Sequence, residues 1–187
     1  MNKLKFAITF FVLIFSSFGL KAHQISQSFS NWTVEDGNIT AVFSVTSRQV
    51  TLLPVLDGYS NNLNEQLTEH LKKNIRVFIN DKNCILDSDI PTKLSSDSSL
   101  KSLLKFDCLE DKGIMRIENS SFFSASAGHI HFARIRIDSN DWQETIFTST
   151  QQEAKFSLLS GKNQRGSLEI FLDYIKLGFE HILSGYD

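Results

Sequence analysis

The chain has 187 residues, a formal net charge of −2 and 41% hydrophobic residues, and 16 of its aromatic residues are Phe. This length and composition favour one globular domain and exclude a disordered chain, a collagen-like repeat and a polytopic membrane protein. The 19 basic residues do not exceed the 21 acidic ones. Because no basic excess is left to neutralise phosphates, we expect no nucleic-acid partner.

Residues 1–22 have the pattern of a secretory signal peptide. Lys3 and Lys5 form a basic start, and an apolar stretch of about 15 residues follows, which is shorter than the roughly 20 residues that span a bilayer. The signal is cut after Gly19, which fits the small-x-small preference, or after Ala22. Removal of residues 1–22 takes away three lysines and changes the formal net charge to −5.

Two cysteines, Cys84 and Cys108, are the only ones in the chain. An exported chain folds in an oxidising compartment, which favours a disulfide between them. The bond would close a loop of about 25 residues and contribute about 3–4 kcal/mol in the chain-entropy description. The alternative is a pair of thiolate metal ligands, which is less favoured because no further cysteine lies nearby.

The residues after the signal indicate a mainly β domain. A hairpin is expected from residues 25–34 and 39–47, because Asp36-Gly37 between them can adopt the positive φ of a tight turn. Further short strands are expected at 75–79, 84–86, 100–109, 113–118, 129–138, 142–149 and 153–159, with a surface loop at 87–99. Strands at this spacing predict an antiparallel β-sandwich or barrel.

One short helix interrupts the strands. Leu63, Leu67 and Leu71 recur at the helical period, and Ser60 or Asn61 can cap the helix. His70 lies on this helix among charged residues, and we expect it to face solvent.

The period changes again at residues 167–187. Apolar residues form one helical stripe there: Leu168, Phe171, Leu172, Ile175, Phe179, Ile182 and Leu183. Such an amphipathic helix packs on the sandwich or lies at a membrane surface. We therefore divide the chain into a signal peptide (1–22), an extracytoplasmic β domain (23–160) and a juxtamembrane helix (167–187).

Histidines are the candidate metal ligands. His129 and His131 fall on one face of a strand, about 6.5–7 Å apart along it. Cleavage after Ala22 would make His23 the first residue, with its α-amine as a second donor. Imidazole and amine donors suit nickel, copper or zinc better than calcium or magnesium, although solvated surface residues show the same pattern.

The strand at 129–138 has an unusual pattern, because its apolar residues change face near Ala133. We expect a bulge there, or a strand that leaves one sheet for another.

Signatures of catalysis are absent from the sequence: it has no Gly-x-Ser-x-Gly elbow, no His-Glu-x-x-His helix and no phosphate-binding glycine loop. We therefore expect no enzymatic activity.

The two ends of the chain resemble one family. Residues 178–187 (GFEHILSGYD) are similar to the Gly-x-x-His-Ile-x-x-Gly-x-Asp-His run that opens the membrane part of HupE/UreJ-type proteins. Residues 22–29 (AHQISQSF) are similar to the Ala-His start of their exported N-terminal domain. This second similarity favours the cut after Ala22.

The resemblance implies an exported domain at the periplasmic face of the inner membrane, in a protein associated with nickel supply to hydrogenase and urease. In that family a membrane permease follows, whose histidines carry the ion. The resemblance thus implies either a fragment that contains the exported domain and the start of the membrane region, or a chain that lacks the permease part and does not transport the ion by itself. Of those histidines this sequence holds His181, with Asp187 near it. The expected function is a non-enzymatic domain linked to nickel uptake or delivery. The alternatives are a metal-independent module docking to membrane or partner helices, and a periplasmic copper-binding protein that uses its N-terminal His23.

Overall fold

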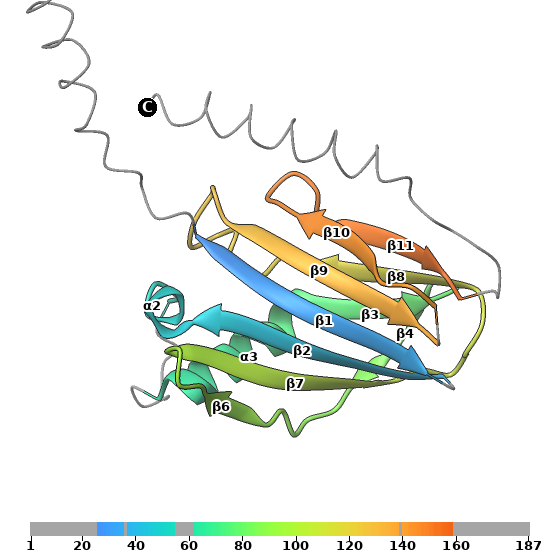
Figure 1. The fold of residues 1–187 in the computed structure, drawn as a ribbon, viewed down its shortest axis with the longest axis horizontal. Helices are drawn as coiled ribbons and strands as arrows, with labels where there is room; N and C mark the ends of the chain where they lie inside the picture. The colour runs from blue at the N-terminus through green and yellow to red at the C-terminus, as the bar shows by residue number, and fades with distance from the viewer. Residues whose placement is uncertain (1–25, 36, 55–61, 139, 159–187) are drawn as a thin grey trace, which may run out of the picture.

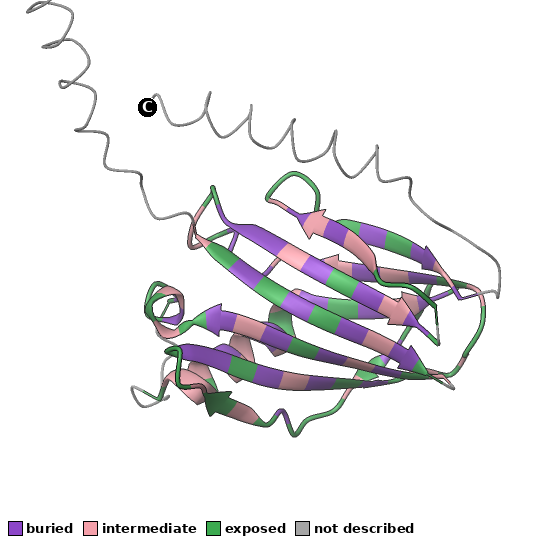
Figure 2. Ribbon diagram, viewed as in Figure 1, coloured by how far each residue is buried: buried purple, intermediate pink, exposed green. Residues whose placement is uncertain are grey.

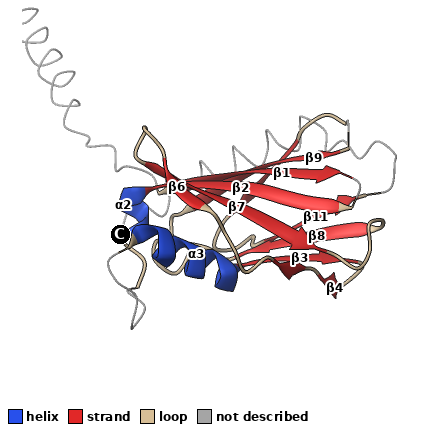
Figure 3. Ribbon diagram, turned by 90° about the horizontal axis from the view of Figure 1, so that it is seen from below, coloured by secondary structure: helices blue, strands red, loops and turns tan. Residues whose placement is uncertain are grey.

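A computed structural model describes residues 26–35, 37–54, 62–138 and 140–158. These residues form two β-sheets packed face to face, with two helices at one end (Figures 1 and 3). The expectation of a mainly β chain is confirmed. The signal peptide, His23, the helix expected at 167–187 and His181 lie outside the described residues.

The larger sheet has seven strands in the order β10-β9-β1-β2-β7-β5, and β6 also pairs with β7. Its strands are β1 (Gln27–Glu35), β2 (Asn38–Thr46), β5 (Ile85–Leu86), β6 (Thr92–Leu94), β7 (Ser99–Asp107), β9 (Ile130–Ile137) and β10 (Gln143–Phe147). The sheet is mixed, because β1 and β9 run parallel. The expected purely antiparallel arrangement is wrong at this one seam.

The smaller sheet has the order β11-β8-β3-β4, and all its pairs are antiparallel. Its strands are β3 (Ile75–Ile79), β4 (Lys82–Asn83), β8 (Ile114–Asn119) and β11 (Glu153–Ser157). The turn between β10 and β11 carries the chain from the larger sheet to the smaller one, through mutual backbone hydrogen bonds of Thr148 and Gln151. The side chains between the two sheets form the core.

Helix α2 (Ser47–Val50) follows β2, and helix α3 (Leu63–Asn74) leads directly into β3. The N-cap of α3 is Asn62, whose side chain accepts a hydrogen bond from the backbone N–H of Asn64, rather than Ser60 or Asn61. Leu67 and Leu71 are fully buried in the common core, as their spacing predicts. No helix within the described ranges is long and apolar enough to cross a bilayer.

Two local expectations are wrong. The stretch 87–99 contains a strand, β6, which pairs with β7 along Thr92↔Ser102. The strand β9 has no bulge near Ala133, because its register with β1 is continuous from Gln27↔Ile130 to Val34↔Ile137. The change of apolar face therefore has another cause, which lies in the partners of its histidines.

The turn between β1 and β2 depends on Gly37. Its φ is +78°, in the left-handed region that favours glycine. A Cβ at this position would also lie only 3.0 Å from the Cβ of Asp111. The expected hairpin is confirmed, with pairing from Glu35↔Asn38 to Ser28↔Val45.

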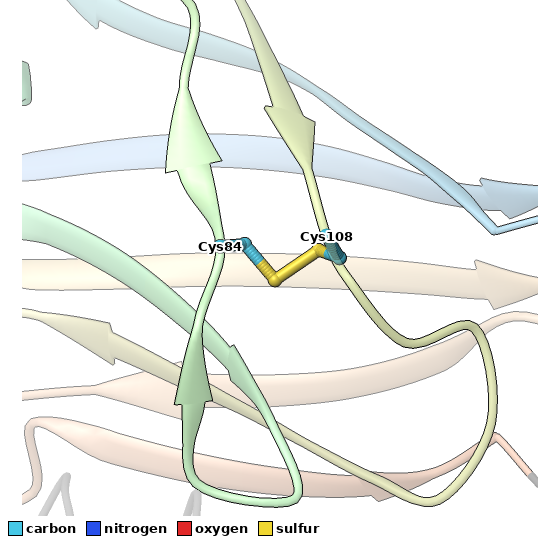
Figure 4. Close-up of a disulfide and its surroundings, with 2 residues drawn as sticks. All are labelled: Cys84 and Cys108. Atoms are coloured by element: carbon cyan, nitrogen blue, oxygen red, sulfur yellow. A yellow bond between two sulfur atoms is a disulfide. The ribbon is translucent and has the colours of Figure 1, made fainter.

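The expected disulfide joins Cys84 to Cys108, with their Cα atoms 4.4 Å apart (Figure 4). Cys84 lies where the chain passes from β4 in the smaller sheet to β5 in the larger one. Because Ile85 is paired with Asp107, the disulfide continues the β5–β7 ladder by one position. The bond thus secures the crossing between the two sheets.

Burial alternates strictly along β1 (Figure 2). Gln27, Phe29 and Asn31 are exposed, whereas the alternate residues face the core. The inward residues of the first half of β1 are serines, which is unusual for a core strand. These serines define the candidate site.

Candidate functional site

The inner face of the β1–β9 seam carries a polar cluster inside an apolar core. Parallel pairing places Ser28 beside His131, and the backbone N–H of Ile130 donates to the carbonyl of Ser26 at 3.0 Å. Side chains at alternate positions of the two chain segments therefore meet on the inner face. We call Ser26, Ser28, Ser30, His129 and His131 the Ser–His ladder.

Each imidazole of the ladder bridges two serines that are two positions apart. The four distances are 2.7 Å from Ser26 Oγ to His129 Nδ1, 2.8 Å from Ser28 Oγ to His129 Nε2, 2.7 Å from Ser28 Oγ to His131 Nδ1 and 2.7 Å from Ser30 Oγ to His131 Nε2. All four ring nitrogens therefore have a hydroxyl partner.

The indole of Trp32 is the starting point for assigning protons to these hydrogen bonds. Its Nε1–H, which can only donate, donates to Ser30 Oγ at 2.7 Å. In the assignment that uses each proton once, the hydroxyl of Ser30 donates to His131 Nε2 and the Nδ1–H of His131 donates to Ser28 Oγ. The same pair of hydrogen bonds then repeats from Ser28 through His129 to Ser26. This assignment makes both histidines neutral Nδ1–H tautomers.

Phenylalanine rings enclose the two imidazoles, each of which is 1% exposed. The ring-centroid distances are 4.9 Å for Phe43 stacked on His131, 5.1 Å for Phe122 stacked on His129, and 5.8 Å for the tilted or edge contacts of Phe147 with His131 and of Phe123 with His129. The ladder is thus a polar line in surroundings that exclude water.

This burial governs the protonation of the ladder. Desolvation, together with the neighbouring His70, lowers the pKa of His129 to about 4. Desolvation, together with His129, lowers the pKa of His131 to about 3. The cause is that an imidazolium in this apolar enclosure would lose its hydration. Both rings are neutral at physiological pH.

His70 does not face solvent as the sequence suggested. Its Nε2 accepts a hydrogen bond from the backbone N–H of Phe122 at 3.1 Å, and its ring meets that of Phe122 edge-on at 4.9 Å. Burial, and then the charge of Lys73, lower the pKa of His70 to about 4. His70 is therefore an acceptor that holds Phe122 in place.

Phe122 adopts a φ of +67°, a left-handed conformation that is rare for a bulky residue. Its carbonyl accepts hydrogen bonds from the backbone N–H groups of Ala125 and Ser126, and the carbonyl of Ser126 accepts from His129 N–H. The strained turn thus places the Phe122 ring over His129. Of its two partners, His70 lies on α3 and His129 directly precedes β9.

Ser–His pairs at 2.7–2.8 Å resemble the nucleophile and base of a hydrolase, but the ladder lacks the rest of that machinery. In a Ser-His-Asp triad a carboxylate accepts the proton of His Nδ1. Here the partners of Nδ1 are serine hydroxyls. Ser28 and Ser30 are also 0% and 2% exposed, so a substrate has no access to their hydroxyls.

The ladder is also closed at one end to proton movement. Trp32, which terminates it, is 2% exposed, and its indole N–H does not accept protons. At the other end, the contact of Ser26 with His129 is partly buried. The hydrogen bonds of the ladder join β1 to the segment that contains His129 and His131.

The structure places the predicted metal ligands as follows. His129 and His131 share one face of the strand, as their spacing predicts, but that face is the inner one. A metal ion between them would have to displace Ser28, whose hydroxyl separates their nearest ring nitrogens. Within the described part of the chain, no three His, Cys, Asp or Glu side chains gather in a group suited to a metal ion. His23 and His181 lie outside the described residues.

Sequence reasoning missed the serines, Trp32 and the role of Phe122. A signal for the serines was present, because Ser26, Ser28 and Ser30 share the alternating face of Trp32. A large aromatic residue on that face indicates that the serines are buried as well. No local pattern indicated Phe122, whose conformation depends on contacts with distant segments.

No family model matches the chain, and the search of curated proteins finds no match either.

Proposed function

We propose that this chain is the exported, non-enzymatic domain of a HupE/UreJ-like membrane protein, at the periplasmic face of the inner membrane. The observation that carries the proposed location is the Cys84–Cys108 disulfide, and the family assignment rests on the sequence resemblance at residues 22–29 and 178–187. Disulfides of this kind persist in oxidising compartments and are rare in the cytosol. The signal-like pattern of residues 1–22 and the family-like residues 178–187 support the same location.

The proposed role is structural and connective rather than catalytic. The three Ser–His contacts most similar to a catalytic pair are buried and lack a carboxylate, which supports a non-enzymatic domain. The link to nickel uptake or delivery, as the family resemblance implies, would then depend on His23, on His181 and on a membrane part, and not on the ladder. The segment 167–187 would connect the domain to the membrane.

A second candidate is a metal-independent module that docks to membrane or partner helices. It is favoured by the engagement of all four ladder nitrogens with serine hydroxyls. Neutral imidazoles that are already paired gain less from a metal ion than free ones, because the hydrogen bonds must first be broken.

The location is tested by recovering the full chain from its native host and measuring intact mass with and without thiol alkylation. We expect a chain that begins at His23, in the extracytoplasmic fraction, with both cysteines protected from alkylation. An uncleaved leader together with two free thiols in the cytosolic fraction would refute the proposal.

The metal link is tested by calorimetric titration of the exported chain with nickel, copper and zinc. The variants are His23→Ala, His181→Ala and, as the ladder control, His131→Gln. Nickel binding that is lost in either terminal variant and kept in the control supports metal delivery, whereas copper binding that needs only His23 supports the copper-binding alternative. No binding by the unmodified chain leaves the metal-independent module as the function.

A further inference from the structure

The outer face of the larger sheet carries a band of apolar side chains across five neighbouring strands. We call Ile146, Phe132, Phe29, Val42 and Leu103 the outer stripe; they lie on β10, β9, β1, β2 and β7 in that order. The register pairs Ile146 with Phe132, Phe132 with Phe29, and Val42 with Leu103, and Val42 lies diagonally from Phe29 across the hairpin. The stripe is therefore continuous.

The stripe is more exposed than a solvated sheet face requires. Phe29 is 46% exposed and Val42 is 40% exposed. The ring of Phe29 stacks on that of Phe132, with centroids 5.4 Å apart. Connected apolar surface of this kind marks a docking site more often than isolated apolar residues do.

Cationic side chains border the stripe. Arg134 and Arg136 lie on the outer face of β9, with the ring centroid of Trp142 at 5.3 Å and 5.2 Å from their guanidinium carbons. Their charges are offset by ion pairs with Glu144 and Glu35. Lys101 and Lys105 are exposed on β7, on either side of Leu103. The apolar centre of the outer face is thus flanked on β7 by two exposed lysines, which suits an amphipathic partner that carries acidic residues.

We propose that residues 168–183 of this same chain pack on the outer stripe as an amphipathic helix. The apolar residues of that segment recur at the helical period, and Glu169, Asp173, Lys176 and Glu180 lie off its apolar face. The three acidic residues among them complement the exposed Lys101 and Lys105 on β7. This inference goes beyond the proposed function and does not depend on export.

The lengths of the segments fit this placement. The last described residue, Leu158, follows β11, and β10 and β11 are joined by a short turn, so that the linker has to pass only the edge strand β10. The linker 159–167 spans up to about 30 Å when extended. A helix over 168–183 is about 24 Å long, and five adjacent strands are about 19 Å across, so that the helix can cover the stripe.

Hydrogen–deuterium exchange on the full chain tests this proposal. We expect the amides of 168–183 to exchange at least tenfold more slowly than in an unstructured peptide. The double variant Phe29→Asp/Val42→Asp should abolish that protection, and Leu109→Asp, which places the same charge at a residue 88% exposed elsewhere, should not. Unprotected amides in the unmodified chain, or protection that survives in the double variant, would overturn the proposal.

A reciprocal variant keeps the test valid if the double variant fails to fold. Phe171→Asp/Ile175→Asp changes the segment and leaves the sheets intact. It should remove the protection of 168–183 and shift the emission of Trp142, which is 41% exposed beside the stripe, to longer wavelength. Trp32 is buried and provides a constant background. Unchanged protection and emission in this variant would argue against the docking.

Two further measurements, at varied protein concentration and with added vesicles, distinguish other possible partners of the outer stripe. Protection that appears only at high protein concentration would identify a second copy of the chain. Protection that appears only with phosphatidylglycerol-containing vesicles would identify a lipid surface. Either result refutes the intramolecular proposal, whereas protection that is independent of both concentration and vesicles supports it.

Discussion

The strand β1 has two neighbours, and the two seams are built in different ways. Its seam with β2 is a hairpin, closed by a tight turn at Gly37, and its inner face pairs the apolar residues Val34 with Ile39 and Trp32 with Ala41. Its seam with β9 joins residues about a hundred positions apart and is filled by the Ser–His ladder. The first seam is local, and β2 contributes only apolar side chains to its inner face. The second seam is distant, and it is polar at the ladder and apolar beyond it, where Trp32 pairs with Ile135.

The difference shows how register is specified without a turn. In a hairpin the turn fixes which residues pair. A parallel seam between distant segments has no such constraint, and a slip by two residues would keep every apolar side chain on its proper face. Such a slip would leave ladder nitrogens and hydroxyls unpaired inside the core, which costs about 1–3 kcal/mol for each group. The ladder thus selects one register.

The largest expected loss of stability follows from removing one imidazole of the Ser–His ladder. His131→Ala leaves Ser30 without its ring partner and Ser28 with His129 alone, and it opens a cavity beside Phe43. We expect the free energy of unfolding to fall by about 4 kcal/mol, measured by urea denaturation. The matched change in the hairpin seam, Val45→Ala, removes only apolar contacts and should cost about 2 kcal/mol. Equal losses in the two variants would show that the polar seam has no special role.

The disulfide is the second connection between distant strands, and its loss should rank next. The Cys84→Ser/Cys108→Ser variant frees a loop with a sequence separation of 24. We expect about 3–4 kcal/mol of lost stability in the chain-entropy description. A reducing agent should reproduce this loss in the unmodified chain and should have no effect on the variant. A reducing agent that leaves the unmodified chain unchanged would contradict the prediction.

Acid should lower the free energy of unfolding through the histidines of the β1–β9 seam, because the β1–β2 seam contains no histidine. The folded-state pKa values of His129 and His131 are lowered to about 4 and about 3, so that the unfolded chain binds protons first as the pH falls below 6.5. Stability is therefore complete above about pH 6.5 and is lost progressively below it, by about 1.5 kcal/mol for each ladder histidine between pH 6.5 and 5. Denaturation curves at pH 8, 6.5 and 5 measure this. Equal stability at pH 6.5 and 5 would disprove the linkage.

The smallest effect concerns the turn of the hairpin seam. Gly37→Ala places a Cβ at φ +78° and 3.0 Å from the Cβ of Asp111. We expect a loss of about 1–2 kcal/mol in thermal or urea unfolding, with the β1–β9 seam unchanged. Exchange rates of the β9 amides serve as the control. Loss of protection in β9 rather than in the hairpin would contradict the separation of the two seams.

Much of the fold could be predicted from local pattern. Alternation of burial is a local property, and it located β1, β2 and β7 to within about two residues. The disulfide followed from a cysteine count and the expected compartment. Alternation of apolar and polar residues indicates which face of a strand is buried, but it does not indicate which strand lies beside it. The parallel pairing of β1 with β9 could therefore not be predicted from it.

The candidate site shows the same limit. The two histidines precede Ala133 and Ile135 on one face of the segment 129–135, and this change from polar to apolar residues predicts a bulge or a strand that leaves one sheet for another. On β1 three serines precede Trp32 on one face in the same way. The two segments thus share a polar-then-apolar inner face, which matches only when the strands run parallel. The role of His70 depended on the strained turn at Phe122, which no local pattern encodes.

The parallel seam has a consequence for the order in which the strands assemble. Because β1 and β2 are adjacent in the sequence, the hairpin can form before β9, which follows about a hundred residues later, is in place. Until then the free edge of β1 is open to mispairing. The hydroxyls at Ser28 and Ser30 make a wrong strand a poor substitute, since only one that presents alternate imidazoles completes the set. The Ser–His ladder thus favours pairing of β1 with β9, which carries the imidazoles that satisfy the serine hydroxyls.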